Sequence, residues 1–300
     1  MSTMIGIVTY GNMPFTKMAL ESIFSTTKLI SNRDIVIIVG LPGDVETAEL
    51  AAYYDIPHFV HETNKGFPAS LNDIYDYCWG ERKVNNIIMM GNDVMAYPYA
   101  IDSLIKVANS SDYEWICSRE YSAKDFIRDY PQTEGYFEGP KMIYKAFDEK
   151  PWLLAVPYSE EIQISAGGLS DVHNLSLFKK SVFDKIGYID VNFYPAYFED
   201  NDYARRGVNA GIKSCTLMNS VYFHFWSRTI HQGKGSSDKQ FNNNSKFYKQ
   251  KWGGDFGREA FSLPFNGHIY SLAGVKMQPS LKIDTRIGET ALIKYWRKKS

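Results

Sequence analysis

Short apolar runs rich in β-branched residues alternate with helix-like patterns through the first third of the chain, and this alternation constrains the fold more than any other feature. The predicted strands span residues 4–9, 34–39, 58–60 and 86–90, and the predicted helices span residues 15–26, 45–54, 68–79 and 99–109. Strands that are apolar on both faces and alternate with helices are typical of a parallel sheet covered on both sides. We therefore predict an α/β fold in which helices cover both faces of a parallel sheet.

Changes in composition along the rest of the chain predict the boundaries of further segments. Residues 112–165 contain many prolines, glycines and aromatic residues, which predicts an irregular, aromatic-rich insertion or lid. Regular patterns return at residue 166. We predict one domain over residues 1–261, made of a first half (1–110), the insertion (111–165) and a second half (166–261), followed by a C-terminal extension (262–300).

The charge and cysteine content exclude several classes of protein. The formal net charge is -1, which gives no global electrostatic reason to bind nucleic acid or a membrane. The three cysteines, Cys78, Cys117 and Cys215, are widely spaced and odd in number, so neither a disulfide framework nor a cysteine metal site is expected. The first residues lack a signal-peptide pattern and no run reaches the roughly 18 apolar residues of a membrane span. A cytoplasmic location is therefore expected.

The segment Gly91-Asn92-Asp93 follows an apolar strand and contains a candidate metal ligand. In parallel sheets, ligands bind beyond the carboxyl ends of the strands. A carboxylate at such a strand end can hold a divalent cation that bridges two phosphates. Asp93 can equally well cap the turn that follows the strand, and both interpretations stay open at this point.

The segment Glu199-Asp200-Asn201-Asp202 concentrates acidic residues after an aromatic run. Adjacent carboxylates repel one another and have to be solvated, paired or bound to a cation. They also suit the first turn of a helix, where the dipole favours negative charge. A carboxylate on such a turn can face a cleft as well, so a cap and a functional group are both compatible with the pattern.

His224 lies in an apolar run, Val221 to Ser227, that resembles a strand. A histidine in such a run is ordinarily a core residue with satisfied hydrogen bonds. At the end of a strand, a neutral imidazole could instead complete a metal site begun by Asp93. His231 is the alternative candidate, in a more polar loop.

The turn after the third predicted strand carries a possible nucleotide-binding element, Asn64-Lys65-Gly66-Phe67. Asn64 can hydrogen-bond a nucleotide, and Gly66 permits a close backbone approach. A plain strand-to-helix turn would have the same composition.

Taken in order, these segments resemble the family 2 inverting glycosyltransferases. The resemblance implies the GT-A fold, a Rossmann-like α/β fold with a mixed, mostly parallel sheet flanked by helices. The resemblance covers residues 4–256. It rests on these segments: Ile5 to Asn12; Asn64-Lys65-Gly66-Phe67 with Asn72; Gly91-Asn92-Asp93; Ile186 to Asp190; Phe198 to Tyr203 with Arg206 and Gly211; and Asn244, Phe247 and Lys251-Trp252-Gly253.

The resemblance implies a nucleotide-sugar donor and a divalent cation, Mn²⁺ or Mg²⁺. It makes residues 1–110 the donor-binding half and 166–261 the acceptor-side half. Asp200 becomes the general base, supported by Glu199, and Asp93 and His224 become the metal ligands. The donor would be bound by Thr9, Tyr10, Asn12, Asn64, Gly66, Asn92 and Asp93, and the acceptor by Gly168, Asp202 and Trp226.

Two departures from the family pattern concern the donor. Gly91 stands where a first Asp often precedes the metal-binding Asp, and the loop 40–44 lacks the Asp that commonly reads the nucleotide base. The sequence therefore does not identify the nucleotide base of the donor.

Two other functions are compatible with an α/β fold of this kind, but each lacks support in the sequence. A nucleotidyltransferase would need a Gly-rich basic loop after the first strand, which residues 10–14 lack. A non-catalytic glycan- or nucleotide-binding protein would not need Asp93, Asp200 and His224 together. Among acceptors, a glycan is expected first, and a hydroxymethylated DNA base, approached by the basic tail 294–299, is possible but not favoured. The sequence indicates no oligomeric state.

Overall fold

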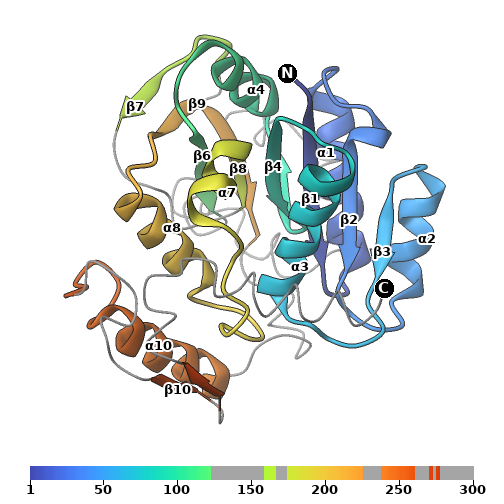
Figure 1. Cartoon of the computed structure of the whole chain (residues 1–300). Coiled ribbons are helices and arrows are strands. Elements are labelled where there is room, and N and C mark those ends of the chain that lie inside the picture. Colours follow the sequence, from blue (N-terminus) through green and yellow to red (C-terminus); the bar gives the residue numbers. More distant parts are fainter. Residues whose placement is uncertain (123–158, 167–173, 226–237, 261–269, 273–274, 278–300) are drawn as a thin grey trace, which may run out of the picture.

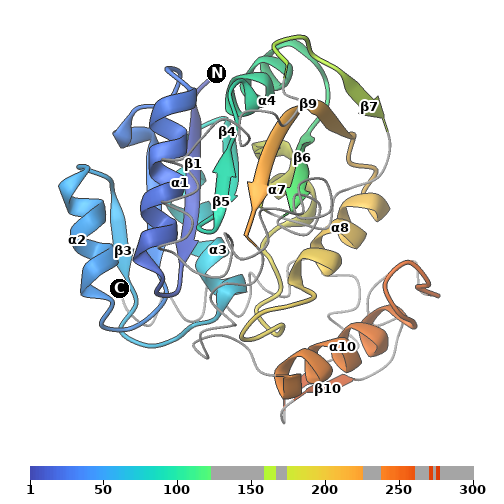
Figure 2. The ribbon, with the colours of Figure 1, turned by 180° about the vertical axis from the view of Figure 1, so that it is seen from behind.

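The computed structural model describes residues 1–122, 159–166, 174–225, 238–260, 270–272 and 275–277, the last two ranges by their backbone alone. A single mixed sheet runs through the molecule, with helices on both faces (Figures 1 and 2). Its strands are β1 (Thr3–Thr9), β2 (Ile35–Val39), β3 (His58–Val60), β4 (Asn86–Gly91), β5 (Val94–Ala96), β6 (Trp115–Ser122), β7 (Ile164–Ala166), β8 (Leu175–Lys179) and β9 (Ser214–His224). A separate antiparallel pair is formed by β10 (Tyr270–Leu272) and β11 (Val275–Met277).

The helices lie between these strands in the chain. They are α1 (Met13–Thr26), α2 (Val45–Tyr53), α3 (Phe67–Tyr75), α4 (Ala100–Ser110), α7 (Lys180–Ile186), α8 (Glu199–Asn209) and α10 (Asp238–Trp252), with a 3₁₀ turn at Asn32–Asp34 and a π-helical turn at Asp76–Glu81. Both α1 and α3 have a proline in their first turn, where the missing N–H costs no hydrogen bond. Among the described helices, none is both long enough and apolar enough to cross a membrane.

The strand order brings the ends of distant segments to one edge of the sheet. The order is β3-β2-β1-β4-β8-β6-β9-β5, and β7 pairs with β9. Strands β1 to β4 are parallel to one another, β8 is antiparallel to both β4 and β6, and β9 is parallel to β6. Strands β1, β2, β3, β4, β6 and β9 therefore point the same way, so their carboxyl ends meet at a common edge.

The core explains why the inner strands are apolar on both faces. All residues of β1 and β2 are buried, and alternate residues enter two different clusters. Ile5 and Ile7 pack in the cluster that includes residues of α1 and α4, whereas Met4 and Val8 pack in the cluster that includes α3, α7 and α8. Gly6 lets α3 lie directly on the sheet, because a Cβ there would be 2.4 Å from Ile74 Cγ2.

The predicted α/β class is confirmed: a mixed sheet flanked by helices is what the structure contains. The prediction that residues 112–165 are irregular is wrong at both ends of that range. Residues 115–122 form β6 in the interior of the sheet, and 164–166 form β7. The second half of β6 is polar, from Ser118 to Ser122, so it lacks the apolar signature of the other inner strands. The rest of the predicted insertion, and almost all of the extension 262–300, lie outside the described residues.

Candidate active site

The carboxyl-end edge of the sheet collects most of the polar residues that the sequence singled out. Thr9 ends β1, Asn92 and Asp93 follow β4, and His224 ends β9. Since these three strands point the same way, residues more than two hundred positions apart reach one side of the molecule. This is the position at which α/β sheets bind their ligands.

Asp93 and His224 meet at this edge, as the sequence led us to expect. His224 Nε2 lies 3.5 Å from Asp93 Oδ1. The pairing is fixed by the backbone, because β5 follows directly after Asp93 and pairs with β9 so that Val94 lies opposite His224. Phe225 N–H also donates to the carbonyl of Asp93 at 3.1 Å.

Two further residues reach His224 that sequence reasoning did not identify. Glu120 Oε1, on β6, lies 3.3 Å from His224 Nδ1. Asn174 Nδ2, just before β8, lies 3.1 Å from the same nitrogen. The one signal for Glu120 was its place at the carboxyl end of a strand, and that strand was not predicted.

The two carboxylates control the charge of His224. Burial of the ring disfavours its charged form, but hydrogen bonding to Asp93 and Glu120 outweighs burial and raises the pKa of His224 to about 9. In the metal-free protein the imidazole is therefore protonated at neutral pH and donates toward both carboxylates.

The turn between β1 and α1 contains two buried polar atoms without a hydrogen-bond partner among the described residues. Thr9 Oγ1 and Asn12 Nδ2 are buried and have no hydrogen-bond partner among the described residues. Asn12 has a left-handed backbone, with φ of 62°, and stands at the N-terminus of α1 without capping it by its side chain. Buried polar groups of this kind ordinarily have a partner, so a polar ligand fits here.

The predicted nucleotide-binding element at 64–67 has a structural task that its sequence did not disclose. Asn64 Oδ1 accepts from Gly66 N at 2.9 Å, and Asn64 Nδ2 donates to Tyr10 Oη at 3.0 Å. Gly66 has φ of 83°, and a Cβ there would be 2.8 Å from the ring of Tyr194 and 3.1 Å from the carbonyl of Pro195. The close approach that Gly66 permits is thus to residues of the second half of the domain rather than to a ligand alone.

Asn92 is buried and braces α1. Its Nδ2 donates to Thr16 Oγ1 at 3.4 Å. This contact joins the turn that carries Asp93 to the helix that begins at the Thr9–Asn12 turn, so the two candidate donor-binding turns are held together.

The first residues of α8 supply Glu199 and Asp200 at the same edge of the sheet. The helix precedes β9, and β9 begins at Ser214 opposite Trp115 at the amino end of β6. Because α8 runs back toward that amino end, its N-terminus lies on the side where β9 finishes. Asp200 is partly exposed there and accepts from Asn201 N–H at 2.8 Å.

Glu199 is buried beside Asp200, and its Oε2 has no hydrogen-bond partner among the described residues. Burial and the neighbouring charge of Asp200 raise the pKa of Glu199 well above its ordinary value. Of the two neighbouring carboxyl groups, Asp200 is therefore the more exposed, and Glu199 is the one whose charged form burial disfavours.

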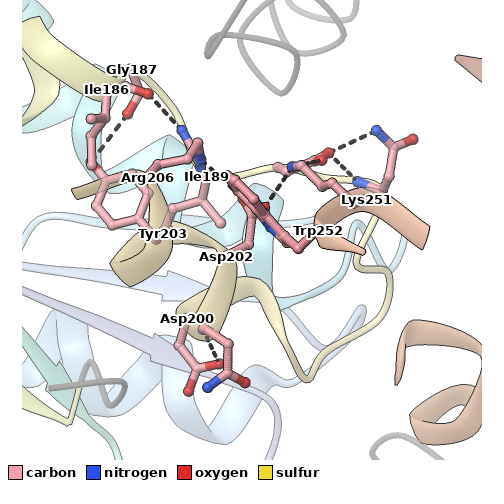
Figure 3. Close-up of polar contacts among 12 residues, drawn as sticks. Ile186, Gly187, Ile189, Asp200, Asp202, Tyr203, Arg206, Lys251 and Trp252 are labelled. Atoms are coloured by element: carbon pink, nitrogen blue, oxygen red, sulfur yellow. Dashed lines mark hydrogen bonds and ion pairs between the residues drawn. The ribbon is translucent and has the colours of Figure 1, made fainter. Parts of the chain in front are cut away.

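The prediction that Asp202 contacts an acceptor is corrected by its surroundings. Asp202 is fully buried, and its carboxylate receives Arg206 Nε at 3.0 Å, Lys251 Nζ at 2.6 Å and Trp252 Nε1 at 2.9 Å. Figure 3 shows this cluster on one side of α8, with Asp200 pointing away from it. Asp202 thus joins α8 to α10, and all of its strong contacts lie within the fold.

Three other predicted residues cannot be placed. Gly168 and Trp226, the remaining acceptor contacts, lie outside the described residues, as does His231, the alternative to His224.

The donor set at Asp93 and His224 fits a divalent cation shared with a substrate. Two ligands at about 2.1 Å from one ion are about 3.0 Å apart at right angles and about 4.2 Å apart when opposite, and the observed 3.5 Å lies between. No group of three or more His, Cys, Asp or Glu side chains in the described part of the chain could hold a metal ion. Mg²⁺-like ions commonly take one or two protein ligands and complete their shell with phosphate and water oxygens.

Comparison with known proteins identifies the fold and no sequence family. No family model and no curated protein matches the sequence. Among solved structures, the mannosyltransferase PcManGT from Pyrobaculum calidifontis, in complex with GDP-Man and Mn²⁺, superposes with a TM-score of 0.51 at 11% identity, over 77% of this chain and 59% of that one. S. aureus TarS 1-349 superposes with a TM-score of 0.50 at 10% identity, over 83% and 73%.

A second structure of S. aureus TarS gives a TM-score of 0.52 at 10% identity. This match covers 84% of the present chain and 44% of that TarS chain, so the present chain spans only part of its structural neighbours. The shared arrangement is the α/β fold of glycosyltransferases, and the expected GT-A, Rossmann-like class is confirmed.

Proposed function

We propose that this protein is an inverting glycosyltransferase that uses Mn²⁺ or Mg²⁺ and moves a sugar from a nucleotide-sugar donor to an acceptor hydroxyl, with a glycan as the favoured acceptor. One observation carries the proposal: Asp93, in the turn after β4, and His224, at the end of β9, meet 3.5 Å apart at the edge to which α8 brings Asp200. The glycosyltransferase neighbours, one of them holding GDP-Man and Mn²⁺, support the same class of donor. The free state of all three cysteines supports a cytoplasmic location.

The donor side of the proposal rests on the turns that follow β1, β3 and β4. Thr9 Oγ1 and Asn12 Nδ2, which have no partner among the described residues, would offer hydrogen bonds to the nucleotide. Tyr10 and Asn64 form a hydrogen-bonded pair beside them, and Asn92 holds the adjacent turn. These residues would orient the nucleotide, while Asp93 and His224 hold the cation against the diphosphate.

The chemical step assigns Asp200 as the general base. A bound divalent cation offsets the negative charge that builds on the departing diphosphate. Asp200 accepts the proton of the acceptor hydroxyl while the oxygen attacks the anomeric carbon. The bond from that carbon to the diphosphate breaks on the opposite face, which inverts the configuration. Burial and the charge of Asp200 raise the pKa of Glu199, which favours its neutral form next to the base.

A binding screen tests the metal and donor assignments together. Thermal unfolding is measured with a panel of nucleotide sugars, with and without Mn²⁺. We expect one donor class to raise the unfolding temperature mainly when Mn²⁺ is present. In Asp93→Ala the Mn²⁺-dependent part should disappear, because the variant loses the carboxylate that holds the ion.

The matched control is Asp112→Ala, which removes an exposed carboxylate before β6, at the opposite end of that strand. It should behave like the wild type. Equal binding with and without Mn²⁺ would contradict the metal assignment, and failure of every nucleotide sugar to bind would contradict the function. Binding without release of nucleoside diphosphate would favour a non-catalytic binding protein instead.

A further inference from the structure

The imidazole of His224 is contacted on both of its nitrogens, from different sides of the ring. Nε2 faces Asp93 Oδ1 at 3.5 Å, and Nδ1 faces Glu120 Oε1 at 3.3 Å. Because the two nitrogens point in different directions, Asp93 and Glu120 do not converge on one point. Glu120 therefore stands behind the ring with respect to the proposed cation.

The sheet holds Glu120 in this position. Glu120 lies opposite Tyr222 in the β6–β9 pairing, and Tyr222 Oη donates to Glu120 Oε2 at 3.3 Å. The pairing is irregular just before this point: Ser118 lies opposite Leu217, whereas Arg119 lies opposite Val221. At this irregularity β9 has three residues without a partner on β6. The polar end of β6 therefore pairs further along β9 and reaches His224.

A side chain at position 91 would meet the residues around His224. A Cβ on Gly91 would lie 3.0 Å from Val94 Cγ2, 3.2 Å from Asn174 Oδ1 and 3.3 Å from Asp93 Oδ1, so these neighbours would have to move by a few tenths of an ångström to admit it. Asn174 also brings its amide nitrogen to 3.1 Å from His224 Nδ1. Among the described residues, the second carboxylate that contacts His224 comes from β6.

We propose that Glu120 is a positioning residue that accepts the Nδ1 hydrogen of His224 and thereby leaves the Nε2 lone pair facing Asp93 for a divalent cation. The proposal rests on the metal site of the proposed function. Two groups face Nδ1: the carboxylate of Glu120, which only accepts hydrogen bonds, and Nδ2 of Asn174, which only donates them. Because a hydrogen bond to an ionised acceptor is the stronger of the two, Glu120 favours the tautomer with hydrogen on Nδ1. Such partners behind a ligating histidine fix its orientation and raise its basicity.

The test measures binding of Mn²⁺ alone to the full chain by electron paramagnetic resonance, which quantifies free Mn²⁺. Glu120→Gln keeps the shape of the side chain and loses its charge, and Glu120→Ala removes the hydrogen-bond acceptor altogether. We expect the affinity for Mn²⁺ to fall by about tenfold in the first and by up to about a hundredfold in the second. Circular dichroism verifies folding, and Glu120→Gln carries the test if Glu120→Ala does not fold.

Glu114→Gln is the matched control, since Glu114 precedes the opposite end of β6 and binds Ser181 and Lys185 there. Its Mn²⁺ affinity should stay within about twofold of the wild type. A spectroscopic readout separates positioning from a general structural effect. Electron spin echo modulation of bound Mn²⁺ should show a histidine nitrogen in the wild type and in Glu114→Gln, with a weaker nitrogen signal in the Glu120 variants.

The outcomes distinguish the role of Glu120 from the proposed metal site on which it rests. Wild-type affinity and an unchanged nitrogen signal in both Glu120 variants, with loss of binding in Asp93→Ala and His224→Ala, would overturn the role of Glu120 and leave the metal site intact. Binding that is unchanged in Asp93→Ala and His224→Ala would overturn the metal site itself.

Discussion

The acidic residues at the start of α8 carry the same formal charge in the sequence but have three different environments in the fold. Glu199 is buried, and its Oε2 has no partner within the described part of the chain. Asp200 is partly exposed, and Asp202 is enclosed by cationic and indole donors. Only Asp200 combines a place at the site edge with access to solvent. The environment of each carboxylate, rather than the charge of the cluster, therefore selects the candidate base.

A second buried carboxylate predicts how stability depends on pH. Burial alone would raise the pKa of Asp190, but Lys251 Nζ at 2.7 Å keeps the pKa below its ordinary value. The folded protein thus binds fewer protons at Asp190 than the unfolded chain does. The resulting stabilisation is fully present above pH of about 4, the ordinary value for Asp, and is lost as pH falls through the folded pKa.

Urea unfolding at pH 6 and pH 3 measures this effect. The wild type should lose stability over this range, and Asp190→Asn should lose less between the two pH values because its side chain does not titrate. An equal loss in both proteins would show that Asp190 does not contribute to the acid sensitivity.

Sequence reasoning at the level of residues succeeded where a strand end was visible. Asp93 and His224 were expected together because each ends an apolar run that reads as a strand. Glu120 was not predicted because it lies in the polar half of β6, which lacks the apolar pattern from which strands were predicted. Asp202 was misassigned, although Arg206 four residues later and the Lys251-Trp252 pair were visible signals for a buried ionic contact.

At the level of elements, α10 is joined to α8 through Lys251. Lys251 Nζ contacts Asp190 at 2.7 Å and Asp202 at 2.6 Å, and all three side chains are almost completely buried. Figures 1 and 2 show α10 beside α8 on the side away from β1 to β3. One cation thus balances two carboxylates where the two helices meet.

Removing that cation should destabilise the fold strongly. In Lys251→Met, Asp190 loses its cation, and Asp202 loses one of its two cations while it keeps Arg206. We expect the free energy of unfolding to fall by about 3–5 kcal/mol. Chemical denaturation measures the change. The matched control is Lys249→Met, which removes a half-exposed lysine of α10 that pairs with Asp255 beyond the end of the helix. It should cost at most about 1 kcal/mol. Similar losses in the two variants would contradict the role assigned to Lys251.

The elements of the first 110 residues could be predicted closely because their apolar periods are uninterrupted. The predicted strand 4–9 is observed as Thr3–Thr9, and the predicted helix 99–109 as Ala100–Ser110. The three-residue strand β5 and the half-polar β6 lack that signal. Their strand structure follows from pairing with β9, which is a tertiary contact and is not encoded in local periodicity.

At the scale of the whole molecule, topology assembles the site. Strands β1, β4, β6 and β9 finish at one edge, and α8 begins there, so Thr9, Asp93, Glu120, Asp200 and His224 converge from across the chain. The alternation of strands and helices predicted this edge in outline. The position of β8 between β4 and β6, antiparallel to both, could not be predicted because it depends on pairing between distant segments.

The measurement that tests the central claim most directly compares wild type and Asp200→Asn with the donor found in the binding screen, in the presence of Mn²⁺. Release of nucleoside diphosphate gives the rate, and calorimetry gives the donor affinity. Loss of a general base should lower kcat by about 10²–10⁴-fold, while the dissociation constant for the donor stays within about twofold. A variant that retains the wild-type rate would contradict the assignment of Asp200 as the base.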